Sequence, residues 1–184
     1  VWMGITPKGT SKLVIHPPGQ KVNGPYYLKC LKKSVNEFKG RTVDGDRIDE
    51  KVLFEDPNDF VVEQDFAKAH ATKAVQNWLS ENVPHHTPLL PSLADEELYM
   101  PPKLDDFWAI ERLWAIWCQT VYAHPMPENI NQLIRRIRKA HRETKVSTLT
   151  KLIHELPARI QEIYRVKGDR IHPSWDYQKS KYRL

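Results

Sequence analysis

The sequence predicts an α/β fold, and three patterns support that class. Residues 61–79, VVEQDFAKAHATKAVQNWL, begin as a short β-branched strand and continue as an amphipathic helix. Two short strands, Trp2–Thr6 and Lys12–His16, flank a turn over residues 7–10 and suggest an antiparallel hairpin. Beyond residue 104, most apolar residues recur at helical spacing. Together these patterns predict strands covered by helices.

The composition is that of a globular protein. The 184 residues are enough for one substantial domain, 1–184, and 40% of them are hydrophobic, with six Trp. No apolar run approaches the ~18–20 residues needed to span a membrane. The chain lacks a signal-peptide pattern and does not begin with Met, so we expect a C-terminal part of a longer protein. Only Cys30 and Cys118 occur, which favours a reducing compartment. The net charge of +5 permits nucleic-acid binding without requiring it.

Asp65 is the first candidate for a functional residue. It ends the predicted buried strand, where open α/β folds place their chemistry. A buried acid is costly unless it is paired or holds a metal. The helix that follows carries one apolar stripe, formed by Ala71, Val75, Trp78 and Leu79. An earlier helix is predicted from Asn23-Gly24-Pro25 to about Phe38, with a buried face of Tyr27, Leu28, Leu31 and Val35.

Two polar segments, residues 40–59 and 83–102, read as loop insertions. The first carries acids at Asp44, Asp46, Asp49 and Glu50 that hint at calcium, but it lacks the order of an EF-hand loop. A charged surface loop is the better interpretation. The second contains His85-His86. Adjacent side chains usually point apart and no further zinc ligand is suitably spaced, so solvated loop histidines are favoured over a metal site.

Residues 104–121 predict a helix with an acid beside its buried face. Asp105 or Asp106 can cap it, and its apolar face comprises Ile110, Leu113, Trp114, Trp117, Cys118 and Val121. Glu111 is flanked by core aromatics, so we expect its carboxylate to be partly desolvated and to need a cation or a donor. Solvated helix surface is the alternative reading for Glu111.

The C-terminal third is helical and basic. A helix begins at Asn129 and presents Arg135, Arg136, Arg138 and Lys139, which either contact DNA or form a solvated face. Another helix contains Leu149, Leu152 and Ile153, and Pro157 interrupts it. A last helix, residues 158–167, is predicted to end at Gly168 and to direct Ile160, Ile163 and Tyr164 inward.

Five segments in order resemble the catalytic domain of mariner-type (DDE/D) transposases. VWMGITPKGTSKLVI is similar to the family's hairpin, and KVNGPYYLKCL to the opening of its first helix. VVEQDFAKAHATKAVQNWL is similar to the strand and helix around the second catalytic Asp. PPKLDDFWAIERLW aligns with the motif of the third catalytic acid, and IHELPARIQEIYRVKGDRI resembles the C-terminal signature.

The resemblance implies an RNase H-like fold, a mixed sheet flanked by helices. It makes Asp65 and Glu111 catalytic acids and ligands of Mg²⁺ or Mn²⁺, with His70 and Asp106 in supporting positions. Two such metals stabilise the attacking and leaving oxygens of a phosphodiester. It further implies DNA as partner, a function in transposition and DNA integration, a possible homodimer, no membrane, and location in the nucleus. For His70, a helix cap or core hydrogen bond is the equal alternative.

The chain also departs from the family pattern. The family's first catalytic Asp lies upstream of the hairpin, and no Asp precedes Asp44 here. Phe66 and Lys68 replace the usual Asn and Pro after Asp65, and several residues around Asp106 differ. These departures support a second hypothesis, a domesticated transposase domain without catalysis that binds DNA or protein.

Overall fold

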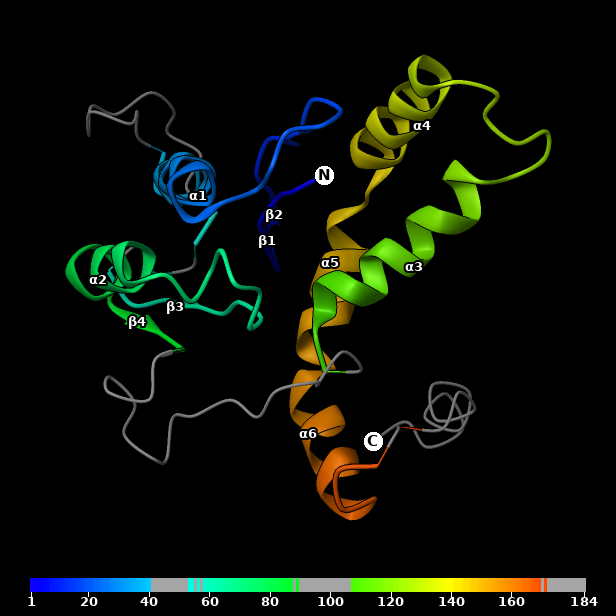
Figure 1. The fold of residues 1–184 in the computed structure, drawn as a ribbon. Helices are drawn as coiled ribbons and strands as arrows, with labels where there is room; N and C mark the ends of the chain where they lie inside the picture. Colours follow the sequence, from blue (N-terminus) through cyan, green and yellow to red (C-terminus); the bar gives the residue numbers. More distant parts are fainter. Residues whose placement is uncertain are drawn as a thin grey trace.

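Two groups of helices lie on either side of the N-terminal strands (Figure 1). The computed structural model describes residues 1–40, 53–54, 56, 58–87, 89, 107–169 and 171. Within them the elements are β1 (Ile5–Thr6), β2 (Gly9–Thr10), α1 (Gly24–Phe38), β3 (Val61–Val62), α2 (Lys73–Asn82), β4 (His85–His86), α3 (Ala109–Val121), α4 (Ile130–Glu143), α5 (Val146–His154) and α6 (Leu156–Arg165). The acids considered for calcium lie outside the described residues, as do Asp105, Asp106 and residues 90–102. None of the described helices is both long enough and apolar enough to cross a bilayer.

The predicted N-terminal hairpin is confirmed, but its second strand, β2, lies at Gly9–Thr10 and not at Lys12–His16, so the turn is tighter than expected. β1 and β2 pair antiparallel around Pro7-Lys8, and a separate bridge joins Trp2 to Val14. The second strand carries one extra residue between these pairings, because Ile5 pairs with Thr10 while Trp2 pairs with Val14. Such a bulge bends the strand. The Ser11 hydroxyl accepts a hydrogen bond from Gly4 N at 2.9 Å within this bend.

The second pair of strands is short and parallel. Val61 and Val62 of β3 pair with His85 and His86 of β4. The interpretation of the two histidines as loop residues was therefore wrong, and so was the expectation of a buried strand, because Val61 is 57% exposed. The α/β class holds. Among the described residues, however, the strands form two separate two-stranded sheets rather than one mixed central sheet.

The first hydrophobic cluster lies between α1 and α2. The side chain of Asn23 accepts a hydrogen bond from Tyr26 N at 3.0 Å and caps α1 as predicted. α2 begins only at Lys73, so Ala71 belongs to the turn before it and not to the helical stripe. The buried members of this cluster are Tyr27, Leu31, Val35, Phe38, Phe54, Phe60, Val75, Leu79 and Val83.

The second hydrophobic cluster is formed by α3, α4 and α5. α3 begins after Trp108, so the predicted Asp cap is not used. Its buried residues Leu113, Trp117 and Val121 recur every four positions, whereas Cys118 is rotated about 100° from Trp117 and is exposed, contrary to prediction. The buried members are Met3, Ala109, Leu113, Trp117, Val121, Ala140, Leu149 and Leu152.

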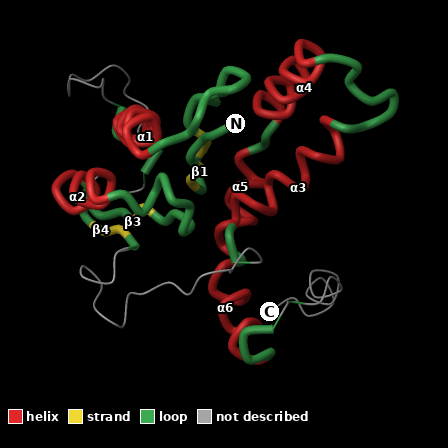
Figure 2. Tube along the Cα trace, viewed as in Figure 1, coloured by secondary structure: helices red, strands yellow, loops and turns green. Residues whose placement is uncertain are grey.

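The N-terminal segment contacts both clusters. Trp2 packs against the first and Met3 is buried in the second, as expected for neighbouring side chains of an extended strand. Three hydrogen bonds tie the hairpin to the second group: Thr150 Oγ1 donates to Pro7 O at 2.8 Å, and His141 Nε2 lies 3.0 Å from both Ser11 O and Thr10 Oγ1. Figure 2 shows the hairpin between α1 and α5.

α6 differs most from its prediction. Its residues Ile160 and Tyr164 were expected inside but are 53% and 87% exposed, while Arg159 is buried. Because α6 extends beyond the other helices (Figure 1), little of the described part of the chain is available to cover these side chains. Its C-terminal stop is as predicted: Gly168 has φ 81° and donates its N–H to Ile163 O at 2.9 Å.

We predict that Gly24→Ala destabilises the protein by about 1–3 kcal/mol, as overpacking in tight sites does. A Cβ at Gly24 would lie 2.6 Å from Thr72 Oγ1, so α1 would be pushed away from the turn that precedes α2. Urea unfolding followed by circular dichroism measures the change. Thr72→Ala in the same chain removes that oxygen and should restore part of the loss. Equal stability of Gly24→Ala and the unchanged protein would contradict this account of the packing.

Candidate functional site

Asp65 follows β3 and is held by two hydrogen bonds. His70 Nδ1 donates to Asp65 Oδ1 at 2.6 Å, and Ala67 N donates to the same oxygen at 3.1 Å. The bond from His70 is the main reason that the pKa of Asp65 is lowered, burial opposes the shift, and Ala67 adds to it. The Asp65 side chain is 55% exposed. The site therefore presents a charged, oriented carboxylate that solutes can reach.

His70 is held in place by two further contacts, one through its ring and one through its backbone carbonyl. It stacks on Tyr27, with ring centroids 3.9 Å apart and planes inclined by 31°. Its carbonyl accepts a hydrogen bond from the fully buried Gln76 at 3.1 Å, and Gln76 Oε1 accepts from Leu89 N at 2.9 Å. The largely buried His70 side chain, 17% exposed, thus makes its hydrogen bond to Asp65 and caps no described helix. It orients Asp65.

The network beneath Asp65 contains residues that the sequence did not single out. Tyr27 Oη donates to Gln64 Oε1 at 2.7 Å, and burial raises the pKa of Tyr27. Gln64 Nε2 is buried without a hydrogen-bond partner, which is a costly arrangement. Burial also raises the pKa of Glu63, a second carboxyl two residues before Asp65. The only sequence signal for this network was polar residues inside an otherwise apolar strand.

Glu111 lies in the first turn of α3 and is exposed. The expectation of a desolvated carboxylate between core aromatics was wrong, because the buried residues of α3 lie on another face. An acid in the first turn is favourable there through the helix dipole. Asp65 and Glu111 carry the hard oxygen donors that Mg²⁺ and Mn²⁺ prefer. Within the described ranges, however, no three His, Cys, Asp or Glu residues form a group that could hold a metal ion, so a complete ligand set is not shown.

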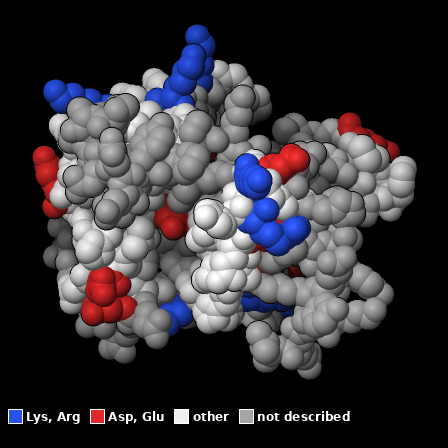
Figure 3. Space-filling view, turned by 90° about the horizontal axis from the view of Figure 1, so that it is seen from below, with Lys and Arg blue, Asp and Glu red and all other residues white. Residues whose placement is uncertain are grey.

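Four exposed basic residues form one face of α4. The half-buried Leu133 and Ile137 and the buried Ala140 pack into the second cluster. The opposite face carries residues spaced three, four and seven positions apart, which places them together on a helix: Arg135, Arg138, Lys139 and Arg142. We call these four residues the α4 basic face. Lys139 also pairs with Glu143 at 3.8 Å. Seen from below, by contrast, the described surface shows separate blue and red patches rather than one basic surface (Figure 3).

Arg136 does not belong to the α4 basic face. Its guanidinium donates to Val121 O at 3.1 Å, to Ala123 O at 2.7 Å and to Pro125 O. It therefore ties α4 to the end of α3 and the connection that follows. Helical spacing shows which basic residues share a face, but not which of them donate hydrogen bonds to backbone carbonyls of the same protein. Arg142, which the sequence placed outward on this helix but not among the candidate DNA contacts, shares the outward face.

Solved structures share this fold at low sequence identity. No protein-family model and no curated protein matches the chain. The structure of the Mos1 transposase catalytic domain with Raltegravir and Mn matches at a TM-score of 0.65 and 14% identity, covering 90% of this chain and 74% of that one. The crystal structure of the Mos1 mariner transposase catalytic domain matches at 0.61 and 15%, covering 90% and 72%. Over nine tenths of its length, the chain has the fold of the mariner transposase catalytic domain.

Proposed function

We propose that this chain is a transposase-type catalytic domain that binds DNA and, with Mg²⁺ or Mn²⁺, cleaves and transfers DNA strands. The observation that carries the proposal is the fold match to the Mos1 catalytic domain across 90% of the chain. Structures of that domain are described with Mn and with Mg. DNA as substrate would imply location in the nucleus, and a homodimer would bring two such domains to two DNA ends.

In this proposal Asp65 and Glu111 hold the metal. A divalent ion between carboxylates stabilises charge on the oxygens of a phosphodiester under attack. Within the described residues, the clearest support for this role is that the Asp65 carboxylate is oriented before any metal binds. His70 and Ala67 bind one carboxylate oxygen, which keeps the group ionised and restricts its rotation. A ligand oriented before the metal arrives loses less conformational freedom on binding.

The α4 basic face supports DNA binding in the same proposal. Arg135, Arg138 and Arg142 are exposed, lie opposite the buried side of the helix and can contact successive backbone phosphates. Arg136 is excluded from this role by its three bonds to carbonyls.

A second candidate function is a DNA- or protein-binding module without catalysis. One observation favours it: the Asp65 oxygen that His70 and Ala67 occupy is already satisfied within the protein. Phe66 and Lys68 beside it also depart from the transposase motif. In this alternative, the Asp65–His70 pair would stabilise the turn and nothing more.

We expect Mn²⁺ to bind this chain saturably in a calorimetric titration, and Asp65→Asn to weaken that binding by at least about tenfold, since one charged ligand is lost. Asp169→Asn, which removes an exposed acid on the segment after α6, is the matched control and should bind like the unchanged chain. Equal affinities for the Asp65 and Asp169 variants would exclude Asp65 as a ligand. Absence of binding in all three proteins would favour the binding module.

We also expect duplex DNA to bind with a strong salt dependence. Arg138→Gln should reduce the slope of log K against log salt concentration by about 0.9, the value for one phosphate contact. Fluorescence anisotropy across a salt series measures the slope. Arg165→Gln, on α6, changes the same charge away from the α4 basic face and serves as control. An unchanged slope for Arg138→Gln would remove α4 from the DNA interface.

A further inference from the structure

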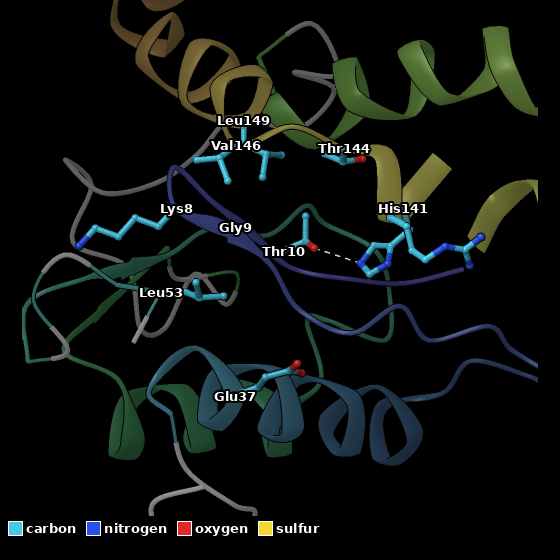
Figure 4. Close-up of a pocket in the computed structure, with 10 residues that line it drawn as sticks. Lys8, Gly9, Thr10, Glu37, Leu53, His141, Thr144, Val146 and Leu149 are labelled. Atoms are coloured by element: carbon cyan, nitrogen blue, oxygen red, sulfur yellow. Dashed lines mark hydrogen bonds between the residues drawn. The ribbon is translucent and has the colours of Figure 1, made fainter. Parts of the chain in front are cut away.

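A hollow of about 290 Å³ opens where the hairpin meets the helices. Its walls come from the tip of the hairpin, the end of α4 and the start of α5, together with Glu37 of α1 and Leu53, so they join segments that are distant in the sequence. Figure 4 shows Val146 and Leu149 pointing from α5 toward Gly9 and Thr10 on the hairpin, with the Glu37 side chain entering from α1. None of these residues belongs to the network around Asp65.

The hollow is held in shape by hydrogen bonds between its walls. His141 Nε2 lies 3.0 Å from both Ser11 O and Thr10 Oγ1. Because a carbonyl only accepts, Nε2 carries the proton, and the Thr10 hydroxyl keeps its own proton for a ligand. Behind the wall, Trp117 Nε1 donates to Oγ1 of the lining residue Thr144 at 2.9 Å. These bonds fix the hollow before any ligand arrives, which lowers the cost of binding.

The charge around the hollow favours an anion. Arg142 is one of the residues that line it, and Lys8, whose ammonium donates to Phe54 O at 3.2 Å, adds a second positive charge at the rim. α5 begins there with no acid in its first turn, so its free N–H groups contribute positive potential. The one carboxylate, Glu37, already accepts Lys12 N through both oxygens, at 3.1 and 3.2 Å.

We propose that this hollow binds a phosphate oxyanion through Arg142, the Thr10 hydroxyl and the first backbone N–H groups of α5. The identity of the natural ligand rests on the proposed function. Arg142 is shared between the hollow and the α4 basic face, so a DNA strand that follows this face would bring a backbone phosphate to the hollow. Free phosphate, or the phosphate of a small molecule, has the same chemistry.

The test is a titration of the ¹⁵N-labelled chain with inorganic phosphate, followed by amide NMR. Saturable shifts are expected at Thr10 and Val146. Thr10→Val, which keeps the branched shape but removes the hydroxyl, and Arg142→Gln should each weaken phosphate binding by about tenfold. Arg165→Gln removes the same charge on α6, outside the lining of the hollow, and should titrate like the unchanged protein. The amide spectrum of each variant shows whether it is folded.

Absence of saturable shifts in the unchanged protein would overturn the proposal. So would equal weakening by Arg165→Gln and Arg142→Gln, because this would indicate a general effect of charge. A short DNA duplex then distinguishes the sources. If it displaces phosphate from the hollow, the natural ligand is a DNA phosphate. If phosphate binds and the duplex does not compete, the site stands as one for free phosphate. If the duplex binds but inorganic phosphate causes no amide shifts, the proposed DNA binding stands and the hollow is excluded as a phosphate site.

Discussion

The rest of the structure depends on an N-terminal strand that must bury side chains on both of its faces. Trp2 packs against the cluster of α1 and α2, and its neighbour Met3 against the cluster of α3, α4 and α5. Alternation of side chains makes this possible only if the strand lies between the two groups. The bulge, with its bond from Gly4 to Ser11, bends the second strand, and Ser11 O then lies within reach of His141. The hairpin thus joins the two clusters. Asp65 and His70 lie beside the first, and the helices of the second carry Glu111 and the α4 basic face.

The Asp65 site shows how buried polar groups can prepare a charged one. Tyr27 contributes its ring to the first cluster, stacks on His70 and directs its hydroxyl to Gln64. His70 is therefore positioned by a residue whose own place is set by hydrophobic packing. The unsatisfied Gln64 Nε2 is the cost of this arrangement, of order 1–3 kcal/mol for such a group. A carboxylate that served only as a polar surface group would not need this network of buried residues beneath it. The network therefore favours a functional role for Asp65.

The sequence predicted local structure better than it predicted contacts. The caps at Asn23 and Asn129 and the extent of α1 and α4 follow from side chains that act on their own neighbours. Asp65 could be found because an acid ends a strand just before an amphipathic helix, whereas His70 was suggested by the resemblance to the transposase motif. The pairing of His85 with Val61 could not, since it depends on residues 24 positions apart. The outward Tyr164 was missed because an apolar stripe predicts a partner, and no described element covers the side of α6 that carries Ile160 and Tyr164.

Arg136 and Arg142 show the same limit within one helix. Both are arginines on α4, and the sequence alone assigned the DNA role to the first. The structure commits Arg136 to the carbonyls at the end of α3, which satisfies acceptors that a helix terminus leaves open. Arg142, one residue after His141, is exposed at the point where α4 ends, the hairpin arrives and α5 begins. The contacts that close the hairpin onto the second cluster therefore also place a cation beside the start of α5. A binding role for α4 would consequently depend on the hairpin, and not on the charge of the helix alone.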